Sequence, residues 1–315
     1  MAYYLVYSLM PYSRRELSRE LNSLKESGCG GIFISIEAKS LRNREAQKRT
    51  NGILKNLLGQ AKVVGLKTGA IIECFHESGY YLTENYTPPV NYLGAPYVPS
   101  AGYYPICPNN PQALQLCYSN IEQVIHKFDL DYLYLQHFRF PFFWEKEELD
   151  IQNRIPPFCY CPFCVTEFSS VMGEIVSSGE QMLTMMPEWL EWRSAVIQSL
   201  LSGIIARIPN RIQVIVAHPP LSFIDLPFTT GQLPQGFIEE GCYLSPQLHH
   251  KIKQKDLVWA EDLLDQYQLE LRANKIFPSF EFDSKIEFDY LTGIAKKFAG
   301  ILLHRRATKK DHLFS

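Results

Sequence analysis

Residues 30–37 read GGIFISIE and residues 67–76 read KTGAIIECFH, and a helical run from about Leu41 to Val64 separates these two β-type runs. A strand, a helix and a second strand in this order are typical of a parallel sheet. The same alternation continues along the chain, with further β-type runs at 3–9, 131–141, 211–220, 275–283 and 299–305. The sequence therefore predicts an α/β fold.

The number of strands points to a TIM-type (β/α)8 barrel. Seven β-type runs are clear, so the weakly patterned stretch 221–255 must hold the eighth, and Phe237–Leu244 (FIEEGCYL) is our candidate. A doubly wound open sheet explains seven strands equally well, but no Gly-rich phosphate loop follows the first one. We expect a single barrel domain over residues 1–315, incomplete at its C-terminal helix because the chain stops about ten residues after the last strand.

Composition excludes several classes of protein. Hydrophobic residues make up 46% and charged residues 20% of the 315, which is the ordinary globular range. Lys plus Arg number 31 against 33 Asp plus Glu, so an electrostatic grip on nucleic acid or an anionic membrane is not expected. The first residues place a short apolar run before basic residues, the reverse of a signal peptide. We expect a soluble cytoplasmic protein and leave open whether it forms a homo-oligomer.

Two long connections follow strand ends, where barrel active sites lie. The connection 77–109 has seven Tyr, six Pro and no Lys or Arg, and 142–164 begins with a Trp and four acids and ends in clustered cysteines. The tyrosines, among them Tyr103 and Tyr104, either pack against one another or present aromatic faces and hydroxyls to a sugar.

The clustered cysteines predict a structural zinc site. Cys159, Cys161 and Cys164 form a C-x-C-x₂-C pattern within FCYCPFC at 158–164. Three thiolates in a tight turn supply three of the four tetrahedral ligands that zinc prefers. The fourth should be a distant Cys or His, and Cys107 in ICPNNP fits best because it ends the Tyr-rich connection. The alternative is a set of unrelated buried thiols.

The motifs CPNNP and CYCPFC and the helix after them resemble glycoside hydrolase family 42, a family of β-galactosidases, over about residues 100–200. The RFP at Arg139–Pro141 is similar to a looser group of barrels assigned as glycoside hydrolases. The resemblance implies a (β/α)8 catalytic barrel with a structural zinc held by four cysteines, which here are Cys107, Cys159, Cys161 and Cys164. It also implies a nucleophilic Glu at the end of the seventh strand, where this chain has Glu281. The acid/base Glu of the family ends the fourth strand, but here residues 135–139 read LQHFR and offer no carboxylate.

Polar residues gather at the predicted strand ends, as expected for the rim of a site. Glycosidases need two carboxyl groups at the scissile bond, one as proton donor and one as nucleophile or base. Our catalytic candidates are Glu281, Asp283, Glu73 and His137. The candidates for substrate binding are Arg139, His218, His76, His304, Tyr103 and Tyr104, and Glu37 is a more remote acid.

Three functions compete for these residues. The first is a glycoside hydrolase acting on a carbohydrate. The second is a lyase or isomerase acting on another small polar substrate, with His137, His218 or His304 as acid or base. The third is a sugar-binding protein that has lost catalysis. Barrels host many chemistries, so the fold alone does not decide among them.

Overall fold

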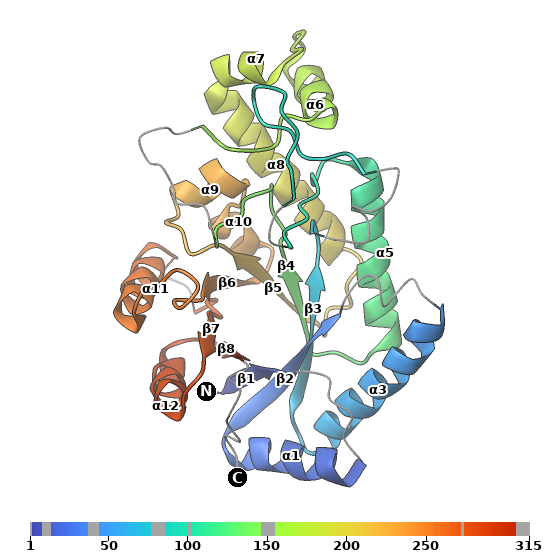
Figure 1. Cartoon of the computed structure of the whole chain (residues 1–315), viewed down its shortest axis with the longest axis vertical. Helices are drawn as coiled ribbons and strands as arrows, with labels where there is room; N and C mark the ends of the chain where they lie inside the picture. Colours follow the sequence, from blue (N-terminus) through green and yellow to red (C-terminus); the bar gives the residue numbers. More distant parts are fainter. Residues whose placement is uncertain are drawn as a thin grey trace.

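A computed structural model of the chain describes residues 2–7, 14–36, 44–76, 86–99, 102–145, 155–271 and 274–306. Eight parallel strands close into a barrel, which confirms the (β/α)8 prediction over the open sheet (Figure 1). The strands are β1 (Tyr3–Val6), β2 (Cys29–Ile36), β3 (Lys67–Glu73), β4 (Tyr132–Gln136), β5 (Gln213–His218), β6 (Tyr243–Leu248), β7 (Ser279–Phe282) and β8 (Ile301–Arg305). β8 pairs with β1 through the partners Tyr3 and Ile301, and this pairing completes the ring.

Helices cover the outside of the barrel between the strands. They are α1 (Arg14–Glu26), α3 (Arg44–Val63), α5 (Pro111–Lys127), α6 (Pro162–Met172), α7 (Gly179–Thr184), α8 (Met186–Ile205), α9 (Asp225–Thr230), α10 (Pro234–Glu239), α11 (Leu257–Leu271), α12 (Lys285–Ile294) and the 3₁₀ turn η1 (Ala295–Lys297). Local chemistry sets several of their starts. Asn110 caps α5 by accepting from the N–H groups of Gln112 and Ala113, and Pro111 supplies a first residue that needs no partner for an N–H.

One strand lies elsewhere than predicted. The sixth strand is Tyr243–Leu248, so only residues 243–244 of the predicted stretch 237–244 belong to it. Residues 237–239 of that stretch belong to α10. The observed strand reads YLSPQL, and its Ser245 and Gln247 are buried. Polar side chains buried in the barrel make this strand look like a loop in the sequence. The region beyond β8, where a final helix was not expected, lies outside the described residues after position 306.

Aromatic side chains fill the lower part of the barrel. The inward-facing cluster consists of Tyr4, Phe33, Ile71, Tyr134, Ile215, Ala217, Phe277 and Leu302. Tyr4 lies edge-on to Phe33 with ring centroids 5.8 Å apart and contacts Phe277 at 5.1 Å. Rings of this size leave room for no side chain at Gly69, whose position faces Phe33. The base of the barrel is therefore a packed core.

The two long connections lie together at one end of the molecule. Figure 1 shows α6 and α7 there, beyond one end of α8, with the Tyr-rich connection beside them. The amide of Tyr160 donates to the carbonyl of Val90 at 2.8 Å, and the rings of Tyr97 and Phe158 meet edge-on at 5.5 Å. Residues 77–85, 100–101 and 146–154 of these connections lie outside the described residues.

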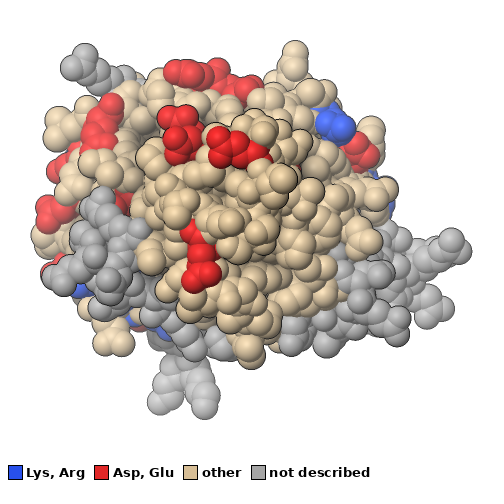
Figure 2. Space-filling view, turned by 90° about the horizontal axis from the view of Figure 1, so that it is seen from above, with Lys and Arg blue, Asp and Glu red and all other residues tan. Residues whose placement is uncertain are grey.

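The face at this end carries acidic side chains. Figure 2 shows Asp and Glu at several places on it and Lys or Arg only near its edge, among the residues shown in colour. Within the described residues, no helix is both long and apolar enough to cross a bilayer.

Gly69→Ala tests the packing of the barrel core. A Cβ at this position would lie 2.4 Å from ring carbons of Phe33, which is fully buried and cannot move aside. We expect a loss of about 1–3 kcal/mol in the free energy of unfolding, as overpacked cores show. Gly59→Ala is the control because a Cβ there meets nothing within 4 Å on α3. It should raise stability by about 0.5–1 kcal/mol, and urea unfolding of both variants measures the difference.

Candidate functional site

The strand ends of the barrel bring acids and histidines into its mouth. Side chains alternate between the two faces of a strand, so residues two positions beyond the inward-facing Ile71, Phe277 and Leu302 also face inward. These residues are Glu73, Ser279 and His304, and Glu281 follows Ser279 on the same face. Beneath them the hydroxyl of Tyr134 lies 3.1 Å from that of Ser245. The mouth is thus polar where the base is aromatic.

Glu73, His76 and His137 form one compact cluster. The Nδ1 atom of His137 is hydrogen-bonded to Oε2 of Glu73, and Nδ1 of His76 lies 3.3 Å from the same oxygen. The two imidazole rings lie 4.6 Å apart. The backbone of His137 has a φ of 52°, a left-handed conformation that is uncommon outside glycine. This conformation turns the chain directly after β4.

The ionisation of this cluster follows from burial and pairing. Burial raises the pKa of Glu73, but the charge and hydrogen bonds of His137 and His76 outweigh it and hold that pKa well below its usual range. Burial lowers the pKa of His137 to about 4, against the opposing effect of Glu73. At neutral pH the pair is a carboxylate that accepts a hydrogen bond from a neutral imidazole.

The Tyr-rich connection and the loop after β4 line this cluster. Tyr103 stacks on His76 at 5.3 Å and on Phe143 at 4.6 Å, and its hydroxyl accepts from the amide of Phe142 at 3.1 Å. Tyr104 lies 6.2 Å from the ring of His76. The buried guanidinium of Arg139 donates through Nη2 to the carbonyl of Phe142, while its Nε and Nη1 have no partner among the described residues. Two nitrogen atoms without a partner in a buried guanidinium suit an oxygen-rich ligand.

Glu145 is a carboxyl group of this mouth that the sequence did not single out. Burial raises its pKa, and the nearby guanidinium of Arg139 opposes this shift. Its Oε2 atom is buried and has no partner within the described part of the chain. The four acids of residues 142–158 were noticed in the sequence, but nothing in their spacing distinguished Glu145 from the rest.

A second group of polar residues occupies the opposite side of the mouth. The hydroxyl of Ser279 lies 2.8 Å from Nε2 of His304 and 3.2 Å from Nε2 of His249. Burial lowers the pKa of His304 to about 4 and that of His249 well below its usual range, with His304 adding to the second shift. His249 was missed because it follows β6, the strand that the sequence placed too early.

Glu281 lies on this side of the mouth and is buried. Its Oε1 accepts from the amide of Ile252 at 2.9 Å, and its Oε2 lies 3.5 Å from Nε of Arg306. The next residue, Lys253, donates through Nζ to the carbonyl of Trp144 at 2.9 Å. The short segment 252–253 therefore contacts both Glu281 and the residue before Glu145, and these contacts join the loops after β4 and β6.

Two other candidates have partners of their own. His218 packs on Tyr267 of α11 at 5.2 Å, and its Nδ1 lies 2.9 Å from the carbonyl of Pro219. Asp283 pairs with Lys251, which also lies 2.9 Å from Glu287. The hydrogen bond to Lys251 is the main reason that the pKa of Asp283 is lowered. No described contact joins either residue to the Glu73 cluster, and Glu37 lies outside the described residues.

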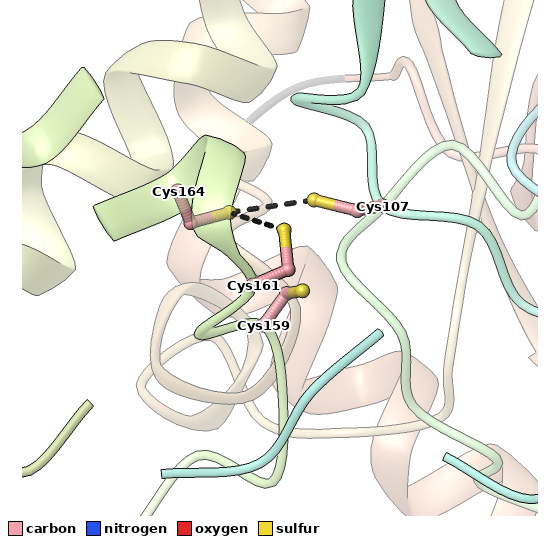
Figure 3. A group of neighbouring side chains, drawn as sticks. All are labelled: Cys107, Cys159, Cys161 and Cys164. Carbon is pink, nitrogen blue, oxygen red and sulfur yellow. Dashed lines mark hydrogen bonds between the residues drawn. The ribbon is translucent and has the colours of Figure 1, made fainter. Parts of the chain in front are cut away.

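The four cysteines converge in a buried cluster that could hold a metal ion. Their sulfur atoms all lie within 4.8 Å of one another. Sγ of Cys164 lies 3.3 Å from Cys107 and 3.7 Å from Cys161, and Figure 3 shows Cys107 reaching the others from a separate segment. Zinc bonds of about 2.3 Å to four tetrahedral ligands space the sulfurs about 3.8 Å apart. The cluster is thus close to the size that such an ion requires.

Arg193 connects this cluster to the barrel. Its guanidinium is fully buried and donates to the carbonyls of Phe228 at 2.6 Å, Phe158 at 2.8 Å and Thr229 at 3.1 Å. It lies over the rings of Phe140 and Trp189, 4.6 and 4.7 Å from their centroids. Burial lowers its pKa to about 10, and the cysteines oppose the shift, so the side chain stays charged at neutral pH.

Comparisons with known proteins agree on the fold. The glycoside hydrolase domain of PgaB (BpsB) from Bordetella bronchiseptica has a TM-score of 0.68 and 9% identity, over 97% of this chain and 93% of that one. The chain therefore shares its (β/α)8 barrel fold with this domain. The catalytic domain of β-amylase from Paenibacillus polymyxa has a TM-score of 0.61, 12% identity and coverage of 96% and 91%. A β-galactosidase from the psychrophilic Marinomonas ef1 has a TM-score of 0.63 and 7% identity, over 97% of this chain and 54% of that one.

Sequence comparisons add nothing to this result, because no family model and no curated protein match the chain. The structural neighbours share the barrel fold with this chain at 7–12% identity and do not single out family 42.

Arg193→Lys tests the connection between the barrel and the cysteine cluster. A lysine cannot reproduce the planar fork that reaches three carbonyls, so acceptors inside the protein lose their donors. We expect the free energy of unfolding to fall by about 2–4 kcal/mol, because each hydrogen bond to a charged group contributes about 1.5–3 kcal/mol. Arg207→Lys is the control, since Arg207 is partly exposed. Equal stability of the two variants in chemical denaturation would contradict the role given to Arg193.

Proposed function

We propose that the chain is a carbohydrate-active barrel enzyme of the glycoside hydrolase type. The observation that carries the proposal is the placement of two carboxyl groups, the buried Glu281 of β7 and the half-buried Glu145 of the loop after β4. The segment 252–253 contacts Glu281 and the residue before Glu145. Glycoside hydrolysis needs such a pair, with one group protonated and the other ionised. The similarity in fold to glycoside hydrolases supports the proposal.

The two carboxyl groups have different roles in this proposal. Glu145 is the proton donor, because its raised pKa keeps the carboxyl protonated to a higher pH and its Oε2 has no partner within the described residues. Glu281 is the nucleophile or base, held in one orientation by the amide of Ile252 and the guanidinium of Arg306. Glu73 and Asp283 are the other candidates for the second carboxyl, but Glu73 is ionised by its histidines and Asp283 is paired with Lys251.

The substrate in this proposal is a sugar bound in the mouth. The unpaired N–H groups of Arg139 donate to hydroxyl oxygens, and Tyr103 and Tyr104 provide aromatic faces beside His76. His304, beside Ser279, and His218, at the end of β5, are the remaining candidates for substrate binding. The whole of residues 1–315 forms the one domain that carries the site.

A structural zinc at Cys107, Cys159, Cys161 and Cys164 is the second part of the proposal. Four buried sulfurs are the donor set of a closed zinc site, without a position for substrate. The CPNNP and CYCPFC motifs support a relation of this loop to family 42. The zinc would hold the Tyr-rich connection, through Cys107, against the start of α6.

A histidine-based lyase or isomerase is the alternative, favoured by one observation. Glu73 and His137 form a carboxylate–imidazole pair at the mouth, the arrangement that orients a general base. In that case proton abstraction would depend on His137, and the Glu145 and Glu281 carboxyls would only bind substrate. A sugar-binding protein without catalysis is the third reading.

Cys161→Ser tests the zinc proposal. We expect about one EDTA-resistant zinc per chain in the unmodified protein, falling to near zero in the variant, together with a lower Tm. Cys242→Ser is the control, because Cys242 is equally buried but does not belong to the cluster. Elemental analysis after gel filtration gives the metal content. Equal zinc in both variants would show that the four sulfurs do not bind it.

Glu145→Gln and Glu281→Gln test the catalytic pair on aryl glycosides that differ in leaving group. Loss of a proton donor should lower kcat for phenyl glycosides by roughly 10²–10⁴-fold and leave dinitrophenyl glycosides, which need no proton, nearly unchanged. Glu281→Gln should abolish turnover of both. The unmodified enzyme should lose activity as the pH rises through the pKa of Glu145, and this alkaline loss should be absent in Glu145→Gln.

The outcomes separate the three functions. Sugar binding without turnover by the unmodified protein would favour the binding protein. Full activity in Glu281→Gln together with loss in His137→Gln would favour the histidine-based enzyme.

A further inference from the structure

We propose that Glu73, His76 and His137 bind a divalent first-row transition-metal ion at the mouth of the barrel, separate from the four cysteines. The donors are Oε2 of Glu73 and Nδ1 of each histidine. One ligand atom from each residue lies within 4.8 Å of the other two. The proposal goes beyond glycoside hydrolysis, which needs no metal, and it depends on this geometry alone.

The hydrogen bonding of His76 carries the argument. Its Nε2 lies 3.2 Å from the carbonyl oxygen of Gly102, and a carbonyl can only accept, so Nε2 carries a proton. In the neutral ring Nδ1 is then a lone pair, and it faces Oε2 of Glu73 at 3.3 Å. A cation, either a second proton or a metal ion, can bridge this nitrogen and this oxygen. A histidine that donates its other N–H to a backbone carbonyl is also the usual arrangement of a metal ligand.

The surroundings hold the three donors in place. Tyr103 stacks on the ring of His76 with an interplanar angle of 21°, so the imidazole cannot rotate freely. The left-handed backbone of His137 turns its side chain back to Glu73 at the end of β3. A neutral His137 can become a ligand when its proton moves from Nδ1 to Nε2, with no change in net charge.

The donor set defines the class of ion. Two imidazoles and one carboxylate suit Mn²⁺, Fe²⁺, Co²⁺ or Zn²⁺, and three protein donors leave positions for oxygen ligands. The neighbouring Arg139, with two nitrogen atoms that have no partner among the described residues, suits an anionic or hydroxyl-rich ligand beside the ion. The four thiolates form a softer and closed site, so the two clusters differ in the metals they retain.

Titration with Mn²⁺ tests this site without relying on activity. The protein is loaded with zinc and washed with dilute EDTA to strip the weaker site. It is then titrated with Mn²⁺ while electron paramagnetic resonance counts the free ion. We expect one Mn²⁺ per chain, bound at least about tenfold more weakly after Glu73→Gln or His76→Gln, with Co²⁺ binding more tightly than Mn²⁺. The half-buried His76 is the safer variant if Glu73→Gln does not fold, as judged by near-UV circular dichroism.

His126→Gln is the matched control, because His126 is exposed on α5 and belongs to neither metal-ligand cluster. It should bind Mn²⁺ as the unmodified protein does. Failure of the unmodified protein to bind either Mn²⁺ or Co²⁺ would overturn the proposal. Equal binding by folded Glu73→Gln and His76→Gln would also overturn it, and would show that any Mn²⁺ bound elsewhere. Neither result would bear on Glu145 and Glu281, whose roles are tested by leaving-group dependence.

Discussion

The upper half of the structure depends on the hydrogen bonds and ring contacts of one buried group, the guanidinium of Arg193. A charge fully removed from water is stable only when it is compensated, and here three carbonyls accept from the two terminal nitrogens and two aromatic rings lie against the guanidinium. The carbonyls belong to the end of α9 and to the segment that leads into the cysteines. One ring, Phe140, follows directly after the residues that turn out of β4. The position of the loop carrying Arg139 is thereby coupled to that of the cysteine cluster.

Arg193 and the cysteine cluster are also coupled electrostatically. Four thiolates around one divalent ion carry a net negative charge, and a buried negative group needs a compensating one. Arg193 is the nearby cation, since the cysteines oppose the effect of burial on its pKa. A metal in the cluster and the charge on Arg193 would therefore stabilise each other. The zinc site and the barrel would then fold as one unit.

The sequence could predict those features of the fold and the site that depend on residues close together in the chain. The barrel followed from the alternation of strands and helices, and the four cysteines from a local spacing and one upstream match. β6 was misplaced because Ser245 and Gln247 face the polar interior, so the usual run of apolar residues is missing. His249 was lost with it. Glu145 is positioned by Trp144 and Lys253, which are far apart in the chain, and no local pattern records such a contact.

The aromatic core at the base of the barrel prevents a small molecule from passing through the barrel. The rings of Tyr4, Phe33 and Phe277 fill the lower barrel and contact one another, so this end of the barrel interior is closed. In the proposed function a substrate would therefore enter and leave at the strand ends, past loops that also hold residues of the proposed site. Product release and entry of the next substrate would then use the same opening. Motion of those loops could then limit kcat as much as the chemical step does.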